Sequence, residues 1–443
     1  MRIAFVSQPR DPIAASGSQW GSVAIVTWEL ARRLARTHEV TVYAPRAPRQ
    51  PGEERGPEGV LVRRTPRVRR LIHKTLDLGT SLANLQPPYF ALPMFFREYG
   101  LAVAGMLARD KPDVVHVQCW SHFVPVFRRV LPDARIVLHS HDALLTRLDR
   151  VKIEQRLASA DALVTCSDFI TREWRSRYPS CAERIHTIGN GVDLAHFTPA
   201  RRDDAFVAPP RILYIGRISP DKGVHILVRA FDELLERRPD AELIVAGPLG
   251  LLPYNQIALY ESDPQVAEMR CFYGAGVLGR LRKQVLGARG SYLQSMRASV
   301  RPSTWERIRF LGSLEHRDLP QHYGGARLLA APSVWQEPFG LPIAEGMASG
   351  LPVVATYAGG IPELVEDGVT GRLVERGDAH ALSRALQELL DDPARASRMG
   401  RAARARAEMR FGWDGVVQRL DAIYHELTPA VRRRCHSSGR LGG

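Results

Sequence analysis

The chain contains, at residues 211–223, the stretch RILYIGRISPDKG. Its first five residues form an apolar run typical of a buried strand, and helical spacing of apolar residues follows over 224–238. Gly216 permits a close backbone approach where the strand ends. Arg217 and Lys222 stand at the start of the predicted helix, where two cations can hold a diphosphate from two sides. The stretch predicts a βα unit with a phosphate clamp at its turn. The alternative is an ordinary turn with solvated charges.

A second stretch, EPFGLPIAE at residues 337–345, follows another predicted strand and opens another predicted helix. The amides of Gly340 and Leu341 would point toward the same place as the clamp, because the first amides of a helix lack helical partners. Glu337 and Glu345 would repel a diphosphate directly. We therefore expect these carboxylates to accept hydrogen bonds from neutral groups, namely the hydroxyls of a sugar and of a ribose.

Alternation of strands and helices extends over the whole chain and predicts parallel, doubly wound α/β sheets. The first series of predicted strands covers residues 1–7, 39–43, 114–118, 135–139 and 162–166. The second covers residues 211–215, 242–246, 308–311, 328–331 and 352–355. Because 443 residues exceed what one core usually supports, we expect two Rossmann-like domains, over 1–200 and 201–410. A basic tail at 428–443 is expected to be disordered.

Two long insertions interrupt the pattern. Residues 46–89 are rich in Pro, Gly and Arg and are predicted to be irregular. The basic segment 63–74, together with the aromatic and apolar residues 89–96, is interpreted as an acceptor-side surface for an anionic membrane or a phosphorylated acceptor. A solvated loop is the alternative. Residues 249–303 are a candidate recognition element, or else a solvated helical excursion.

Composition excludes several classes of protein. A hydrophobic fraction of 45% and a charged fraction of 24% are ordinary for a globular protein, and no apolar run approaches the roughly 18 residues of a membrane span. The N-terminus lacks a signal-peptide core, so we expect a cytoplasmic location, with peripheral contact at the inner membrane face as an extension. The five cysteines are scattered and predict neither disulfides nor zinc. The net charge of +14 rests mainly on arginine and accompanies no nucleic-acid-binding motif, so no nucleic acid partner is expected.

With these motifs in this order, the chain resembles the large retaining glycosyltransferase family of GT-B architecture that is commonly numbered family 4, or group 1. The matching motifs are Asn190-Gly191-Val192-Asp193, the Gly-Arg and Lys-Gly segment at 216–223, Phe310-Leu311-Gly312 with Leu314, the Glu337 to Glu345 element, Gly359 to Glu363 and Gly368 to Gly371. The resemblance implies two Rossmann-like domains facing a central cleft, with the nucleotide-sugar donor in the second. It also implies that a closing helix over 411–427 packs back on the first domain.

The resemblance assigns roles to individual residues. Arg217 and Lys222 would hold the donor diphosphate, Glu345 the ribose, and Glu337 the transferred sugar. The amides of Phe339, Gly340 and Leu341 would assist Glu337, while Leu314, Gly17 and His141 complete the implied set, Gly17 facing the diphosphate and His141 the reacting sugar. The implied catalytic residues are His141, Glu337, Arg217 and Lys222. For His141, a purely structural role is the alternative. Gln118 departs from the family, which often carries a second histidine there.

The expected reaction is hexosyl transfer from a UDP- or GDP-sugar to a hydroxyl acceptor in glycan, glycolipid or glycosylated metabolite synthesis. Two cations and a helix N-terminus would stabilise the leaving diphosphate. No Asp-x-Asp occurs, so neither a metal nor another cofactor is expected. No carboxylate stands out as a nucleophile, which favours front-face substitution. Alternatives are a sugar-nucleotide epimerase, a phosphorylase or a non-catalytic sugar-nucleotide-binding protein.

Overall fold

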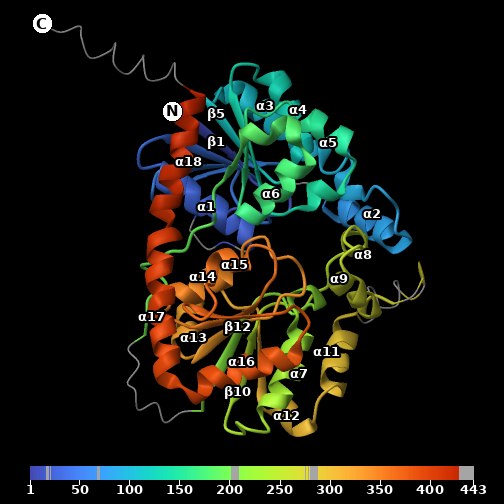
Figure 1. Ribbon diagram of the computed structural model, residues 1–443. Helices are drawn as coiled ribbons and strands as arrows, with labels where there is room; N and C mark the ends of the chain where they lie inside the picture. The colour runs from blue at the N-terminus through green and yellow to red at the C-terminus, as the bar shows by residue number, and fades with distance from the viewer. Residues whose placement is uncertain are drawn as a thin grey trace, which may run out of the picture. The chain divides into compact units, whose positions relative to one another are not determined.

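The computed structural model describes residues 1–15, 19, 21–66, 70–200, 209–274, 276–277, 279 and 288–428 (Figure 1). The chain divides into two compact units. The first comprises Met1–Thr75, Phe90–Asn190 and the part from Trp413 onward, and the second comprises Leu76–Tyr89 and Gly191–Gly412. The second unit resumes at Gly191, about ten residues before the boundary expected near residue 200. Residues 429–443 of the expected tail lie outside the described residues.

The first unit is built on an eight-stranded sheet in the order β3-β4-β2-β1-β5-β6-β7-β8. Its strands are β1 (Arg2–Val6), β2 (Glu39–Pro45), β3 (Glu53–Arg55), β4 (Leu61–Thr65), β5 (Val114–Gln118), β6 (Arg135–Ser140), β7 (Ala162–Thr165) and β8 (Ile185–Thr187). All neighbouring pairs are parallel except β3 and β4. The five residues of β5 and the four of β7 are all buried, as expected for a parallel sheet covered on both faces.

The helices of the first unit follow its strands. They are α1 (Ser22–Leu34), the beginning of α2 (Arg70–Ala83), α3 (Arg97–Asp110), α4 (Val124–Val130), α5 (Arg150–Leu157), α6 (Asp168–Arg177) and α18 (Trp413–Leu427), with short turns η1 (Tyr89–Ala91), η2 (Ser121–Phe123), η3 (Leu144–Arg147) and η4 (Pro179–Arg184). The C-terminal helix α18 packs along α1. Arg33 of α1 bonds to Asp414, and its guanidinium lies 5.9 Å from the Trp413 ring centroid.

The second unit has a six-stranded, fully parallel sheet in the order β11-β10-β9-β12-β13-β14. Its strands are β9 (Arg211–Ile215), β10 (Glu242–Ala246), β11 (Ile308–Gly312), β12 (Leu328–Ala331), β13 (Val353–Thr356) and β14 (Gly371–Val374). Its helices include α7 (Val224–Leu234), α8 (Tyr254–Ala258), α9 (Pro264–Glu268), α11 (Ala288–Ala298), α12 (Pro302–Glu306), α13 (Leu319–Gly324), α14 (Leu341–Ala348), α15 (Ile361–Leu364), α16 (Ala379–Asp391) and α17 (Pro393–Arg410). Short turns are η5 (Pro220–Lys222), η6 (Met269–Phe272) and η7 (His316–Asp318).

The prediction of an irregular segment over 46–89 is wrong for much of its length. The segment contains β3, β4 and α2, and β4 extends the sheet beside β2. β4 has the sequence LVRRT, and its two arginines interrupt the apolar pattern by which a buried strand is predicted. In the structure, Arg64 is nevertheless buried and pairs with Glu54 at 2.6 Å. The helix predicted over 224–238 ends earlier, at Leu234. Among the described residues, no helix is long and apolar enough to cross a membrane.

Candidate functional site

The candidate donor site lies in the second unit, where the strand order of the sheet reverses. β9 and β12 are neighbours there, and the strands on either side continue in opposite directions along the sheet. In open α/β sheets, ligands bind outside the carboxyl ends of the strands at such a switch point. The loop after β9 carries Arg217 and Lys222, and the loop after β12 carries Glu337. The topology therefore brings together Lys222 and Glu337, which are 115 positions apart in the sequence.

The two loops touch through their backbones. Gly223 has a φ of +71°, and a Cβ at this position would lie 1.8 Å from the carbonyl oxygen of Pro332. The amides of Val334 and Trp335 donate to the carbonyl oxygen of Asp221, at 3.1 and 2.9 Å. No residue with a side chain fits at Gly223 without moving one of the loops. This contact fixes the loop that ends in Lys222 against the loop that leads to Glu337.

Lys222 and Glu337 form an ion pair. The Lys222 ammonium donates to Glu337 Oε2 at 2.5 Å, and the Ser333 hydroxyl lies 3.4 Å from the same oxygen. The Glu337 carbonyl accepts from the amide of Gly360 at 2.7 Å, and a Cβ on Gly359 would lie 2.3 Å from that carbonyl oxygen. Both the main chain and the side chain of Glu337 are therefore held, and a diphosphate at Lys222 would share the ammonium with this carboxylate.

Arg217 is held by a carboxylate that the sequence analysis did not single out. Its Nη2 donates to Asp221 Oδ2 at 2.7 Å and its Nε to the Ser219 hydroxyl at 3.1 Å. Burial works to lower the pKa of the Arg217 guanidinium, but Asp221 outweighs burial and the pKa is raised. Asp221 is 2% exposed, and its Oδ1 has no hydrogen-bond partner among the described residues. Arg217 is a fixed, permanent cation at this loop.

The insertion over 249–303 packs against the same loops. Tyr273 and Tyr292 are buried, and burial together with the nearby Asp221 carboxylate raises the pKa of each phenol. Arg376 makes a two-point ion pair with Asp263 of the insertion, at 2.8 and 3.2 Å. Arg376 also donates to the carbonyl of Val334 at 2.8 Å. At these residues the insertion supports the donor loops, which does not fit the solvated excursion that was its alternative.

Glu345, on α14, is buried and uses both of its oxygens. Oε1 lies 2.8 Å from His316 Nε2, and Oε2 accepts from the Tyr323 hydroxyl at 2.8 Å. Burial, and then the Glu345 carboxylate, raise the pKa of Tyr323 well above its usual value. A carboxylate offers about four lone-pair directions, so Glu345 can accept a further hydroxyl without losing these partners. His316 and Tyr323 precede α14 in the chain, and no motif marks them.

The N-terminus of α14 completes the site. Gly340 has a φ of +102° and precedes the helix, whose first turn contains Pro342. The Leu341 amide is the first of the helix and has no helical acceptor, so it can serve an anion or a sugar oxygen. The Phe339 side chain is buried and lies 5.9 Å from the Phe411 ring, so only its backbone is available for a ligand. Leu314, after β11, is half-buried.

In the first unit, His141 follows β6 and contacts the end of β5. Its Nε2 lies 2.7 Å from Gln118 Oε1. An amide oxygen only accepts, so Nε2 carries the proton and Nδ1 is left as an acceptor. Burial lowers the pKa of His141 to about 3, which keeps the ring neutral near pH 7. Gln118, at which the sequence departs from the family pattern, therefore selects the tautomer of the predicted catalytic histidine.

Behind His141 lies a buried row of rings that the sequence analysis did not predict. The His139 ring lies 4.1 Å from the His141 ring, and His139 Nδ1 lies 3.1 Å from His116 Nε2. His116 Nδ1 lies 2.6 Å from the hydroxyl of Tyr424 on α18. Burial lowers the pKa of His116 to about 3 and that of His139 well below its usual value. The C-terminal helix thus supplies a hydrogen-bond partner to the histidines behind the end of β6.

The predicted site residues fall into separate groups. Arg217, Lys222 and Glu337 lie on the two touching loops of the second unit, and Glu345 lies on α14, which follows them. His141 belongs to the first unit. Gly17 lies outside the described residues. Asp221 lies within the stretch 211–223, next to Lys222, but its position in the sequence alone does not mark it as the partner of Arg217.

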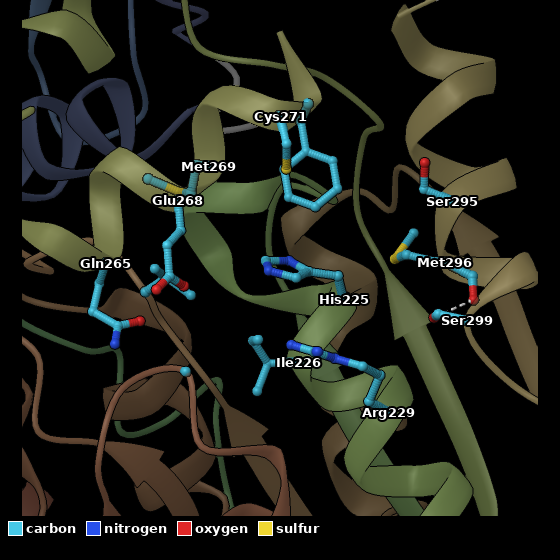
Figure 2. A pocket seen from close by; sticks show the side chains of 13 residues that line it. His225, Ile226, Arg229, Gln265, Glu268, Met269, Cys271, Ser295, Met296 and Ser299 are labelled. Atoms are coloured by element: carbon cyan, nitrogen blue, oxygen red, sulfur yellow. Dashed lines mark hydrogen bonds between the residues drawn. The ribbon is translucent and has the colours of Figure 1, made fainter. Parts of the chain in front are cut away.

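A separate hollow of about 280 Å³ lies between α7 and the insertion (Figure 2). Figure 2 shows His225 and Arg229 projecting from α7, with Glu268 coming from the end of α9. His225 Nδ1 lies 3.0 Å from the hydroxyl of the buried Tyr292, so α7 and α11 are linked at this hollow. None of the predicted donor residues lines it.

Family models match both halves of the chain. The model described as glycosyl transferases group 1 matches residues 200–406, and the model described as glycosyltransferase family 4 matches residues 23–196. The D-inositol 3-phosphate glycosyltransferase 1 of Catenulispora acidiphila is 30% identical over 467 residues, which cover 98% of this chain and 97% of that protein. The spore coat protein SA of Bacillus subtilis is 24% identical and covers 96% of this chain and 100% of that protein.

Solved structures with the same fold span nearly the whole chain. The sucrose-phosphate synthase of Thermosynechococcus elongatus matches with a TM-score of 0.70 at 22% identity, covering 97% of this chain and 100% of that one. The Anabaena HepE protein, solved in complex with UDP-glucose, matches with a TM-score of 0.63 at 20% identity, covering 96% and 100%. At these identities the likeness concerns the fold.

Proposed function

We propose that this chain, which belongs to the group 1 glycosyltransferases, transfers a hexosyl unit from a UDP- or GDP-sugar to a hydroxyl acceptor with retention of configuration. It is a transferase of GT-B fold, and its likeness to glycosyltransferases favours sugar transfer over the epimerase, phosphorylase and non-catalytic alternatives. The single observation that carries the proposal is the switch point of the second sheet. There, two cations and a helix N-terminus converge, each cation fixed by a carboxylate.

Charge stabilisation of the leaving diphosphate is the main catalytic effect in this proposal. Donors that are already oriented before the reaction stabilise developing charge without reorganisation. Arg217 is oriented by Asp221, and Lys222 is oriented by Glu337. The Arg217–Asp221 and Lys222–Glu337 ion pairs together carry no net charge, so net charge alone does not attract a diphosphate. Selectivity for a diphosphate over other anions therefore rests on the positions of the two cations and on the amides before α14. The carboxylates keep the cations in place.

The two glutamates recognise the neutral parts of the donor. Glu345 keeps lone pairs free beside its bonds to Tyr323 and His316, and it would accept from a ribose hydroxyl. Glu337 would accept from a hydroxyl of the transferred sugar, with the amides of Phe339, Gly340 and Leu341 beside it. Neither role needs the carboxylate to change its protonation state.

His141 would act as a neutral acceptor toward the reacting sugar. Its Nδ1 is the acceptor atom, because Nε2 donates to Gln118. With a pKa of about 3, this ring is a poor general base at neutral pH. The acceptor proton would therefore pass to the leaving phosphate in a front-face substitution. No metal takes part in this scheme, since Arg217 and Lys222 supply the positive charge.

The geometry of the site does not select the donor base or the acceptor. The candidates to be tested therefore come from the relatives and from the acceptor classes that the sequence leaves open. The relatives include D-inositol 3-phosphate glycosyltransferases and a GDP-mannose-dependent phosphatidylinositol monomannoside mannosyltransferase. An inositol phosphate, an aminocyclitol, a saccharide and a lipid-linked sugar form the acceptor panel, each with UDP-, GDP- and ADP-sugars as donors.

A two-step experiment tests the proposal. A donor that binds only the folded protein raises its melting temperature, so the sugar nucleotides are first compared by thermal shift. The donor that shifts the protein is then incubated with each acceptor. We expect release of free nucleotide only when the correct acceptor is present, with unchanged rates in EDTA. Nucleotide release independent of every acceptor, or activity that EDTA abolishes and Mg²⁺ restores, would contradict it.

A further inference from the structure

A cluster of three side chains in the first unit lies apart from the residues assigned to transfer. His38 stands in the turn between α1 and β2, and its amide donates to the carbonyl of Leu34 at 2.9 Å, which fixes its backbone. Asp421 and His425 lie one turn apart on α18. His38 Nε2 is 2.8 Å from Asp421 Oδ1, and His425 Nε2 is 3.7 Å from Asp421 Oδ2. One potential ligand atom from each side chain lies within 4.8 Å of the others.

We propose that His38, Asp421 and His425 bind a divalent transition-metal ion, of which Zn²⁺ is the best match, and that this ion fastens α18 to the turn before β2. Two imidazole nitrogens and one carboxylate oxygen form a common zinc ligand set, with water in the fourth position. Bond lengths of about 2 Å place the ligand atoms of a tetrahedral site roughly 3.3 Å apart. The distances from Asp421 to His38 and to His425, 2.8 and 3.7 Å, lie on either side of this value. Rotations of the side chains are therefore enough to bring the ligand atoms into place.

The surroundings favour a metal over a simple ion pair. In the described part of the chain, no arginine or lysine forms an ion pair with Asp421, and its side-chain partners are His38 and His425. Arg33 in the last turn of α1 and Arg36 just after this helix both contact Asp414 instead. The side chain of His38 is 7% exposed, whereas that of His425 is 36% exposed. One ligand is thus rigid and enclosed, and another is open to an incoming ion.

The proposed site has a structural consequence within the same turn of α18. Tyr424 lies between Asp421 and His425 in sequence and holds His116 through its hydroxyl at 2.6 Å. An ion that fixes this turn would also fix Tyr424 against the buried histidines. The ion itself would stay outside the chemistry, because none of its ligands belongs to the residues proposed to touch substrate. Its loss should therefore lower thermal stability and leave turnover at 25 °C nearly unchanged.

The test uses untagged, full-length protein that has been treated with EDTA and dialysed. Zn²⁺ should bind with a stoichiometry of one by calorimetry and raise the melting temperature by about 5 °C. Co²⁺ should give the visible absorption of a tetrahedral site with nitrogen and oxygen ligands. His425→Ala, on a half-exposed position that should fold normally, is expected to abolish both effects, and His38→Ala should do the same.

The matched control is His380→Ala, because His380 is an exposed histidine that pairs with the carboxylate of Glu233 and belongs to no group of three potential ligands among the described residues. This variant should bind Zn²⁺ like the wild type. Asp421→Asn covers the case in which His38→Ala does not fold, since it removes the charge and keeps the shape. If His425→Ala and Asp421→Asn bind Zn²⁺ as tightly as the wild type, or if the wild type binds none, the proposal is overturned.

Discussion

Arg217 is the residue on which the proposed donor chemistry depends most. Replacing it with Ala removes a fixed cation from the leaving group, and turnover should fall roughly 100-fold or more, equivalent to about 3 kcal/mol of transition-state stabilisation. Steady-state kinetics with saturating donor measures this loss. The melting temperature must be recorded in parallel, because the substitution leaves the buried Asp221 carboxylate without its partner.

Arg229→Ala is the matched control, since Arg229 lies on α7 in the same unit and lines the hollow of Figure 2. It should keep turnover within about threefold of the wild type, as expected for a surface substitution. Wild-type turnover in Arg217→Ala would remove Arg217 from the catalytic residues.

At this scale, the sequence predicts that these charged residues lie close together, but it does not predict which side chains orient them. Arg217, Lys222 and Glu337 were predictable because glycine, cations and carboxylates follow strand-like runs in a spacing that suits a diphosphate sugar. Asp221 stands in the same stretch, yet only the structure shows that it orients Arg217. His316 and Tyr323 could not be predicted, because their link to Glu345 arises from the packing of α13 and the preceding turn against α14.

Gly223 acts at the scale of the elements, because it sets how closely the loop after β9 approaches the loop after β12. Gly223→Ala would place a Cβ 1.8 Å from the Pro332 oxygen. The loops must separate, so we expect a loss of about 2 kcal/mol or more in stability and a reduced affinity for the donor, because Lys222 moves away from Glu337. Urea unfolding and donor thermal shifts measure the two effects.

Gly368→Ala separates the clash from the cost of a left-handed backbone. Gly368 has a similar φ of +77°, but a Cβ added there would meet no atom within 4 Å. This control should lose only about 1 kcal/mol and keep normal donor binding. Equal losses in the two variants would show that the close approach of the loops has no special role.

The order of elements was largely predictable, whereas their lengths and the insertions were not. Buried parallel strands are nearly continuous apolar runs, so β7 and β13 stand out in the sequence. β4 does not, because two of its five residues are arginines. The sequence did not decide whether residues 249–303 are helical. It also could not predict that the insertion is held by the ion pair of Asp263 with Arg376, because these residues are 113 positions apart.

At the scale of a whole unit, buried histidines predict a dependence of stability on pH. Burial lowers the pKa of His116, His122 and His141 to about 3. An unfolded histidine titrates near 6.5, so between about pH 3 and 6.5 the unfolded chain binds more protons than the folded one. Stability must then decrease as the pH falls through this window. The melting temperature should drop steadily between pH 7 and pH 5.

His122→Asn tests this origin, because asparagine can still donate to the carbonyl of Phe95, which His122 contacts at 2.9 Å, but does not titrate. The variant should lose less stability than the wild type over the same pH range. The identical slope in both proteins would assign the pH dependence to other groups.

The last prediction concerns association of the whole molecule with a membrane, which the sequence placed on the basic segment 63–74. Residues 67–69 of that segment lie outside the described residues, but α2 supplies an independent observation. Its buried face is polar, with His73, Asp77 and Ser81, whereas Leu71, Ile72 and Leu76 are exposed by 74, 47 and 46%.

This inverted helix suits an anionic lipid surface, because its outer apolar side chains can enter the interface while the exposed Lys74 meets the headgroups. Leu71→Ser with Leu76→Ser should reduce sedimentation with vesicles that contain phosphatidylserine roughly tenfold, at unchanged melting temperature and donor binding.

Arg67→Gln, Arg69→Gln and Arg70→Gln together should weaken vesicle binding most at low salt, since salt screens the contribution of these charges. The matched control, Val151→Ser with Met409→Ser, removes two other exposed apolar side chains and should bind vesicles normally. If the α2 variant sediments like this control, the exposed face of α2 does not bind lipid, and the inversion serves only the packing of His73, Asp77 and Ser81.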